Sequence, residues 1–367
     1  MTLNILPIVG ALILSAIGGF VFIPALLNFC KRKKLYDMPN QRKIHKCLIP
    51  RLGGIAFMPS MLLAFFIVTQ IMNYEAQGAK IQVSTWSLGF LISLLLIYSV
   101  GIIDDLIGLD AKVKFVVQII AASILPLCSL YINNLYGLFG IHEIPYYIGF
   151  PLTVFLLVFI DNAMNLIDGI DGLSASLTII SLIGFLTCFM GKGMDAYMIL
   201  IAGLIGVLVS YLYFNLLGNA EKNRKIFMGD AGSLTLGFIL GFLLVKTMMT
   251  SSLKSFAYEQ VVLAYSLFIV PTFDVARVII HRMRRHLPIF DADKSHIHHK
   301  LMATGLSQHK SLICILLLQI GFILLNMAIL QFLTDSITCI FCMDIAVYTL
   351  YHLFINSRIK NSKTSNQ

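Results

Sequence analysis

Residues 88–108 read LGFLISLLLIYSVGIIDDLIG, an apolar run from Leu88 to Ile103 that ends at two adjacent aspartates, Asp104 and Asp105. An apolar helix of about 20 residues is long enough to cross a lipid bilayer. A charged side chain inside the hydrocarbon costs about 3 kcal/mol, so carboxylates at the end of such a run are typical of an ion pathway or a catalytic face. The stretch therefore predicts a membrane span with chemistry at its end.

The composition extends this prediction to the whole chain of 367 residues. Hydrophobic residues make up 58% of it and charged residues 12%, and the mean hydropathy is +0.87. Because roughly 25% of the residues in soluble domains are charged, we predict an all-α, polytopic membrane protein with eleven transmembrane helices. The predicted spans are residues 4–28, 53–73, 86–103, 113–133, 146–164, 173–191, 195–216, 232–250, 258–281, 311–333 and 337–356.

Positive residues set the predicted orientation. The first span is followed, not preceded, by a basic cluster (31–34), which predicts a retained span with its N-terminus outside. Residues 30–52, 104–112, 165–172, 217–231, 282–310 and 357–367 are then cytoplasmic, and 23 of the 27 Lys and Arg residues lie there or at the adjoining span ends. We expect one catalytic transmembrane domain (1–357) and a short basic cytoplasmic tail (358–367).

The net charge of +9 therefore belongs to one membrane face. Basic stretches that border spans suit membrane lipids with anionic headgroups, or an anionic substrate, rather than nucleic acid.

Polar motifs recur in the predicted cytoplasmic loops. The first loop carries Arg42, Lys43 and His45 ahead of Pro50-Arg51-Leu52-Gly53-Gly54, which indicates phosphate binding or a simple positive-inside anchor. The adjacent Asp104 and Asp105 repel each other unless a cation or metal compensates their charge, and Lys114 follows them.

The next motif reads DNAMNLIDGIDG over residues 161–172. A polar residue recurs at every third position, which on a helix forms one polar ridge; these residues are Asn162, Asn165, Asp168 and Asp171. Core packing does not explain such a ridge, although one member could cap a helix.

Two further motifs complete the set. Asn215 precedes Met228-Gly229-Asp230-Ala231-Gly232-Ser233, in which Asp230 suits either a helix cap or an oxygen ligand for Mg²⁺. The last long loop contains His296, His298 and His299. No cysteine accompanies these histidines, so hydrogen bonds to phosphate or sugar oxygens are a better interpretation than zinc.

Carboxylates, amides, histidines and cations on one membrane face are the inventory of metal-dependent phosphoryl transfer. We expect a soluble nucleotide diphosphate as donor and a lipid phosphate as acceptor. An ion-coupled transporter is the alternative from another class, but transporters place such groups near the bilayer midplane.

The chain also resembles a known family. RKIHKCLIPRLGG (42–54), GIIDDLIGL (101–109), NAMNLIDGIDGLS (162–174), FMGDAGSLTLGF (227–238) and SHIHHKL (295–301) are similar, in the same order, to motifs of the polyprenyl-phosphate N-acetylhexosamine-1-phosphate transferases. The resemblance implies transfer of a sugar 1-phosphate from a UDP-N-acetylhexosamine to undecaprenyl phosphate, with release of UMP. It also implies Mg²⁺, with Mn²⁺ as a substitute, and a bacterial plasma (inner) membrane enzyme whose active site faces the cytoplasm.

The resemblance assigns roles to matching residues. Asp104 and Asp105 would bind or deprotonate the lipid phosphate, Asn165 and Asp230 would ligate Mg²⁺, and Asp168 and Asp171 would bind the nucleotide and organise catalysis. His296 is the predicted catalytic histidine. The expected substrate-binding residues are Arg42, Lys43, His45, Lys114, Asn162, Asn215, His298 and His299.

The short HIHH form and the eleventh span resemble the N-acetylglucosamine-type enzymes that start O-antigen, enterobacterial common antigen or teichoic acid chains. Transfer of phospho-N-acetylmuramoyl-pentapeptide is the alternative reaction within the family. The resemblance to the family also implies a homodimer. The stretch LGNAEKNRKI (217–226) departs from the family pattern. Which of Asp104 and Asp105 acts as base, and whether the reaction takes one step or two, are both left open.

Overall fold

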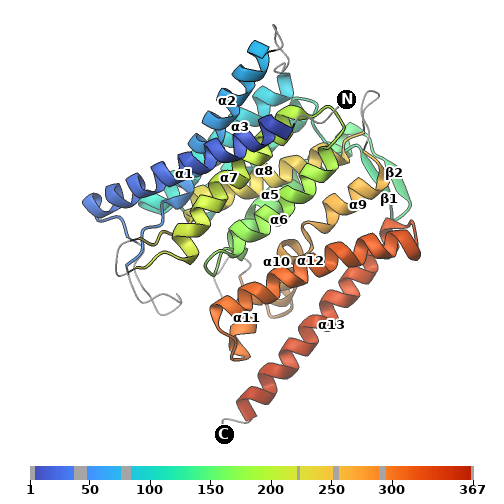
Figure 1. The fold of residues 1–367 in the computed structure, drawn as a ribbon. Helices are drawn as coiled ribbons and strands as arrows, with labels where there is room; N and C mark the ends of the chain where they lie inside the picture. Colours follow the sequence, from blue (N-terminus) through green and yellow to red (C-terminus); the bar gives the residue numbers. More distant parts are fainter. Residues whose placement is uncertain are drawn as a thin grey trace.

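The computed structural model describes residues 5–36, 48–75, 84–220, 224–250, 256–288 and 295–364. They form helices packed side by side, with one antiparallel hairpin (Figure 1). The elements are α1 (Ile5–Lys33), η1 (Gly53–Ala56), α2 (Phe57–Glu75), α3 (Thr85–Ile107), α4 (Ala111–Leu127), β1 (Asn134–Leu138), β2 (Ile141–Glu143), α5 (Tyr146–Ile167), α6 (Leu173–Phe189), α7 (Asp195–Leu216), α8 (Gly229–Met248), α9 (Tyr258–Ser266), α10 (Ile269–Arg284), α11 (Ile297–Ala303), α12 (Gln308–Phe332) and α13 (Ile337–Thr364).

The all-α membrane architecture is confirmed at the level of helix length and composition. Within the described ranges, eight helices are long and apolar enough to span a membrane, and the bent pair α9–α10 makes nine. The two further predicted spans fall on α4 and α6, which have 17 residues each. The total of eleven therefore stays a prediction.

One predicted span ends early. The span expected over 113–133 corresponds to α4, which stops at Leu127. Ser129 adopts a left-handed conformation (φ 65°) and Leu130 donates its N–H to the Leu125 carbonyl at 3.0 Å. This backbone reversal closes the helix end, and the chain continues into the β1–β2 hairpin, which the hydropathy pattern did not predict.

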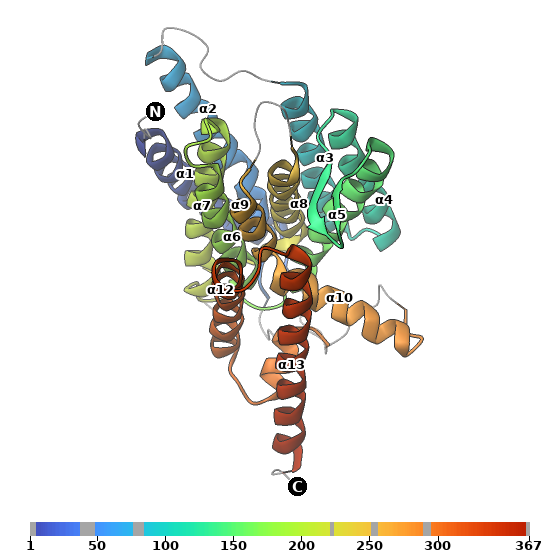
Figure 2. The same ribbon diagram turned by 90° about the vertical axis from the view of Figure 1, so that its right-hand side faces the viewer.

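A second predicted span, 258–281, is broken into α9 and α10, which meet at 55°. Pro271 lies in the first turn of α10, where a missing N–H costs nothing. Gln319 of α12 satisfies the broken backbone: its amide donates to the Ser266 carbonyl at 2.8 Å and accepts the Val270 N–H at 3.2 Å. The bend carries α10 sideways out of the bundle (Figure 2).

Helix α8 forms the centre of the bundle. Of its most apolar 18-residue window, 89% is buried, compared with 17% for α1. Helices α3, α5, α6 and α9 pack around it. Gly101 of α3 lies so close to α8 that an added Cβ would come within 2.5 Å of the Ala231 Cα. This contact brings the aspartates at the end of α3 beside the start of α8.

The N-terminal and C-terminal helices reach opposite ends of the bundle. In both ribbon views α1 begins at one end and α13 finishes at the other (Figures 1 and 2). The α12–α13 hairpin lies along the side of the bundle, next to α9, α10 and α11. This hairpin therefore packs against both the broken helix and the short helix that follows it.

We expect Gly206→Ala to destabilise the protein, because α1 and α7 touch at this point. A Cβ at Gly206 would lie 2.1 Å from the Leu12 carbonyl oxygen and 3.0 Å from the Ala16 nitrogen, and backbone atoms cannot rotate away. Overpacking of this kind costs about 1–3 kcal/mol. The midpoint of thermal unfolding in detergent should fall.

The matched control is Gly321→Ala on α12, where an added Cβ meets nothing within 4 Å. Alanine should be neutral or favourable there by about 0.5–1 kcal/mol. Equal midpoints for the two variants would contradict the close packing of α1 on α7.

Candidate active site

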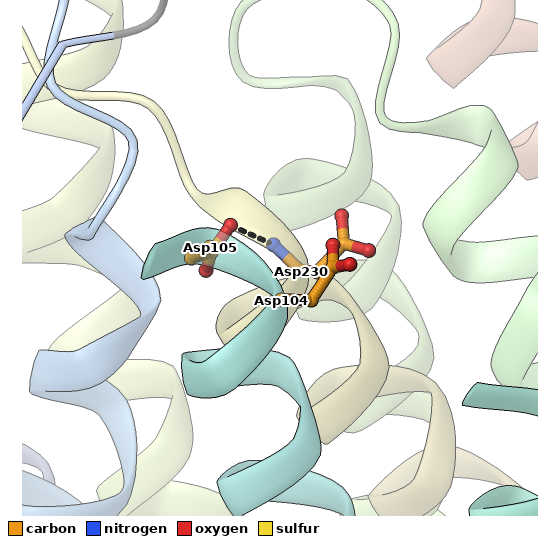
Figure 3. A group of neighbouring side chains, drawn as sticks. All are labelled: Asp104, Asp105 and Asp230. Atoms are coloured by element: carbon orange, nitrogen blue, oxygen red, sulfur yellow. Dashed lines mark hydrogen bonds between the residues drawn. The ribbon is translucent and has the colours of Figure 1, made fainter. Parts of the chain in front are cut away.

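Three carboxylates from two helix ends meet at one place. Asp104 and Asp105 end α3 and are 8% and 6% exposed, and Asp230 lies in the first turn of α8. One oxygen from each lies within 4.8 Å of the other two (Figure 3). Negative charges this close repel one another and disfavour the ionised form of each carboxylate. The cluster therefore requires compensating positive charge.

Asp105 joins the two helices. Its Oδ1 accepts the backbone N–H of Asp230 at 2.9 Å, the bond drawn in Figure 3, and its Oδ2 accepts the N–H of Ala231 at 2.9 Å. The first N–H groups of a helix have no partner within the helix and carry a partial positive charge. Asp105 therefore caps α8 from a neighbouring helix.

Arg51 closes the end of α3. Its guanidinium donates to the carbonyl oxygens of Asp105 at 2.8 and 3.0 Å and of Asp104 at 3.3 Å. The chain around Arg51 is held beside the approach to α8, since Phe227 donates to the Pro50 carbonyl and Gly53 donates to the Phe227 carbonyl. The PRLGG and FMGD motifs thus form one backbone unit.

Lys114 and Asn165 complete the acidic cluster. The Lys114 ammonium lies 2.8 Å from Asp230 Oδ2 and 3.2 Å from Asp104 Oδ2. The Asn165 amide donates to Asp230 Oδ1 at 3.2 Å and to the Ser233 hydroxyl at 2.8 Å. Four predicted motif residues therefore touch or neighbour Asp230, although they come from α3, α4 and α5.

A polar cavity of about 550 Å³ opens beside this cluster. Of the predicted site residues, it is lined by Asp105, Asn165, Asp168, Asp171, Asn215, Asp230 and His299. Lys225 also lines it and pairs with Asp171 Oδ2 at 2.6 Å. Cations and carboxylates thus face one space that is large enough for a small-molecule substrate.

Asn215 holds two walls of the cavity together. It is 2% exposed. Its amide oxygen accepts the Gly172 N–H at 2.6 Å, and its amide nitrogen donates to the Ile226 carbonyl at 2.9 Å. Because backbone groups use both polar atoms, Asn215 orders the loops that carry Asp171 and Lys225.

Asp168 follows the last residue of α5. Burial, together with the neighbouring carboxylates of Asp230, Asp171 and Asp105, raises the pKa of Asp168 to about 7. Crowding of this kind near a cavity is typical of functional sites.

Some predicted residues lie elsewhere. The Asn162 amide donates to Gln118 of α4 at 2.8 Å and to the Val158 carbonyl, away from the cavity. His296 and His298 are 7% and 2% exposed and pack behind His299, which does face the cavity. Arg42, Lys43 and His45 lie outside the described residues.

The acidic cluster fits a divalent cation of the Mg²⁺ type. Its donors are carboxylate oxygens from Asp104, Asp105 and Asp230 within one 4.8 Å group, and hard oxygen donors are what Mg²⁺ prefers. Lys114 already supplies a positive charge to two of these carboxylates. Asn165, bonded to Asp230, has an amide oxygen that can add a neutral ligand.

Asp274 of α10 was missed in the sequence. It is fully buried and pairs with His296 and Arg277. Its position inside the predicted span 258–281 was an available signal, because ionisable residues within membrane spans are rare and usually serve a function. Gln118 is 2% exposed and hydrogen-bonded to Asn162. Nothing in the sequence pattern distinguished this uncharged residue in the same way.

Comparison with known proteins gives a consistent result. The sequence pattern described as glycosyl transferase family 4 matches residues 87–248. The chain is 33% identical over 317 residues to the probable undecaprenyl-phosphate N-acetylglucosaminyl 1-phosphate transferase of Bacillus subtilis, covering 86% of this chain and 82% of that protein.

Two more relatives are similar over most of this chain and most of their own length. The undecaprenyl-phosphate alpha-N-acetylglucosaminyl 1-phosphate transferase of Escherichia coli K12 is 30% identical, over 82% of this chain and 79% of its own. The decaprenyl-phosphate N-acetylglucosaminephosphotransferase of Mycobacterium tuberculosis H37Rv is 30% identical, over 78% and 73% respectively.

We expect Asp168 to make stability depend on pH. Its pKa is about 7 in the folded protein and 3.8 for an ordinary aspartate, so the folded state holds the proton more tightly. In metal-free buffer this contribution is complete below about pH 4 and is lost as the pH rises to about 7. The Asp168→Asn variant lacks this pH-dependent contribution to stability.

The measurement is the unfolding midpoint of both proteins between about pH 3 and about pH 8, a range that brackets the two pKa values of 3.8 and about 7. The midpoint of the variant minus that of the wild type should rise up to about pH 7 and then level off. A difference that does not change with pH would show that Asp168 has an ordinary pKa.

Proposed function

Because the chain belongs to the polyprenyl-phosphate N-acetylhexosamine-1-phosphate transferases of glycosyl transferase family 4, we propose that it transfers N-acetylglucosamine 1-phosphate from UDP-N-acetylglucosamine to undecaprenyl phosphate. The observation that carries the proposal is the meeting of Asp104, Asp105 and Asp230 beside a polar cavity of about 550 Å³. The acceptor and the transferred group are those in the names of the relatives, and the UDP-linked donor is the one that the family resemblance implies.

The reaction exchanges one phosphorus–oxygen bond for another. An oxygen of the lipid phosphate bonds to the phosphorus that carries the sugar, and the bond from that phosphorus to the uridine phosphate breaks. UMP leaves with the bridging oxygen and its electron pair. A bound Mg²⁺ would neutralise phosphate charge during this exchange. Asp230 and Asn165 would hold the ion, next to the two aspartates of α3.

The geometry supports different roles for the two aspartates of α3. Asp105 uses both oxygens to cap α8, so we assign it to holding the cluster together. Asp104 accepts the Leu109 N–H through Oδ1, whereas its Oδ2 is held by a side chain, the Lys114 ammonium. We therefore assign to Asp104 the acceptance of the proton from the lipid phosphate, and to Lys114 the neutralisation of phosphate charge.

The second half of the cavity suits the nucleotide. Lys225 and Asp171 form an ion pair on its wall, and Asp168 and His299 face the same space. We assign Asp168 and Asp171 to nucleotide binding and His299 to the donor phosphates. The predicted role of His296 in proton transfer stays a proposal, since its ring packs behind His298 and His299 and does not line the cavity. Arg42, Lys43 and His45 remain proposed phosphate-binding residues.

We place the active site on the cytoplasmic face of the bacterial inner membrane, with the N-terminus outside. The distribution of Lys and Arg supports this side. The polar cluster lies at helix ends, which favours an enzyme over a transporter with a midplane site. The relatives are N-acetylglucosaminyl enzymes, which favours that sugar over phospho-N-acetylmuramoyl-pentapeptide. Homodimer formation and the identity of the glycan stay predictions.

The experiment that tests the proposal incubates purified protein in detergent with undecaprenyl phosphate, Mg²⁺ and a panel of radiolabelled UDP-sugars. We expect label from UDP-N-acetylglucosamine to enter the lipid, with UMP as the co-product. UDP as the co-product would mean transfer of the sugar alone. No transfer from any donor would contradict the proposal.

Asp230→Asn should abolish transfer while leaving the protein folded, because it removes a carboxylate shared by Lys114, Asn165 and the proposed metal. Loss of one preorganised electrostatic group costs about 100- to 1,000-fold in rate. The readouts are initial rate and unfolding midpoint. Asp335→Asn, an exposed aspartate in the turn between α12 and α13, is the control. Near-normal rates for Asp230→Asn would refute its assignment.

Removal of divalent cations should stop the reaction. Excess chelator should reduce transfer to background, and Mg²⁺ or Mn²⁺ added above the chelator concentration should restore it, since phosphate charge must be neutralised during transfer. Chelator already saturated with Mg²⁺ is the control. Full activity of chelated, dialysed protein would exclude the acidic cluster as an essential metal site.

A further inference from the structure

Asp274 is a fully buried aspartate that the proposed chemistry does not use. It lies in α10, five residues after the break from α9, with 0% exposure. A buried carboxylate without partners is costly, so its contacts indicate what it is for. Within the described residues, its hydrogen bonds come from α10 itself and from the start of α11, where the HIHH motif lies.

The carboxylate receives hydrogen bonds from three residues. His296 Nδ1 lies 2.8 Å from Oδ2, and the Arg277 guanidinium donates to Oδ1 at 2.8 Å. The backbone N–H of Ile297 is shared between both oxygens at 3.1 and 3.2 Å. Arg277 also donates to the Ser295 carbonyl. Asp274 and Arg277 together hold residues 295–297 in place.

The contact with His296 determines where that ring carries its hydrogen. A carboxylate only accepts hydrogen bonds, so Nδ1 of His296 must be the protonated nitrogen. The other nitrogen, Nε2, then has its lone pair available and is the atom that can exchange a proton. Pairs of this kind fix both the tautomer and the orientation of a histidine.

The other buried histidine of the motif is suited to packing. His298 is 2% exposed. Its ring packs directly on Gly169, where an added Cβ would lie 2.1 Å from the His298 Nε2. Burial and the neighbouring His299 and His296 lower the pKa of His298 to about 3. His298 is therefore neutral near pH 7, and it docks α11 on the loop that carries Asp168.

We propose that Asp274 is a positioning residue for the transfer reaction, acting through His296 by fixing the hydrogen on Nδ1 and presenting Nε2. The proposal rests on the function proposed above for His296. It adds a residue of α10 to a site otherwise built from α3, α4, α5 and α8. It also gives a role to the buried acid of α10, three residues after Pro271.

A purely structural role makes a different prediction. Asp274 accepts the Ile297 N–H and so also caps α11, and loss of that cap would loosen the loop regardless of His296. A double-mutant cycle separates the two roles, because residues that act through one another give non-additive effects. Asp274→Asn is the informative substitution, since its amide can place a donor opposite Nδ1 and favour the wrong tautomer.

The experiment measures kcat and KM for UDP-N-acetylglucosamine with Mg²⁺ and undecaprenyl phosphate, using the full chain and its Asp274→Asn, His296→Gln and double variants. We expect Asp274→Asn to lower kcat by about 10²- to 10⁴-fold, the upper value being that of a protease whose carboxylate–histidine pair is altered in the same way. KM should change by less than about threefold. The double variant should be no slower than the slower single variant.

Asp344→Asn is the matched control. Asp344 of α13 is also fully buried, and it accepts hydrogen bonds from Tyr265 and Asn326 rather than from a histidine. Its kcat should stay within about twofold of the wild type. Asp274→Glu, which keeps the carboxylate, should retain more activity than Asp274→Asn, and it replaces that variant in the cycle if Asp274→Asn does not fold.

The outcomes distinguish the two proposals. Multiplicative effects in the cycle, or normal kcat for the Asp274 variant with a slow His296 variant, would overturn the positioning role and leave the transferase function intact. Absence of transfer by the wild type with every UDP-sugar would instead overturn the function. A non-additive cycle with normal unfolding midpoints supports positioning.

Discussion

The structure depends on the carboxylate of Asp105 accepting the first free N–H groups of α8. This interaction joins the end of one span to the start of another at a place where three acids crowd together. Two backbone dipoles, the Lys114 ammonium and the Asn165 amide offset the repulsion. Since α8 is the most buried of the membrane-length helices in the described part of the chain, the position of its first turn also sets the positions of the helices around it.

The membrane imposes a second constraint on the same molecule. In hydrocarbon, each backbone group that leaves a regular helix needs a partner from the protein. Gln319 provides both partners at the break between α9 and α10. The break in turn directs α10 sideways and places Asp274 beneath the HIHH motif. A buried amide on α12 is therefore linked, through helix geometry, to the orientation of His296.

The cavity has two parts with different electrostatics. The part near α3 and α8 is lined by Asp105 and Asp230, next to the ion pairs of Lys114, as suits phosphate and metal. The part near residues 168–171 and 225 pairs Asp171 with Lys225, and Asn215 holds its walls through two backbone bonds. A reaction that joins a nucleotide sugar to a lipid phosphate needs two such neighbouring regions.

Much of the site was predictable because its chemistry resides in short motifs. The spacing of Asp104 and Asp105 after an apolar run, and the polar ridge of residues 162–171, indicated a catalytic membrane face. The structure confirms that Asp104, Asp105, Lys114, Asn165 and Asp230 meet. The ridge interpretation was wrong for three of its four residues. Asn162 packs on Gln118, because a period of three drifts around a helix of 3.6 residues per turn, and Asp168 and Asp171 lie beyond the end of α5.

The sequence by itself determined the helical membrane class and several of the motif residues that meet beside the cavity, since hydropathy and local charge act over a few residues. Only the tertiary structure decided what each group does: Asp105 caps α8, Asn215 ties two loops together, and Asp274 holds His296. Each of these roles is a contact between residues at least 11 positions apart in the chain, 125 for Asp105 and Asp230. Local patterns do not specify such contacts, because they depend on how the whole bundle packs.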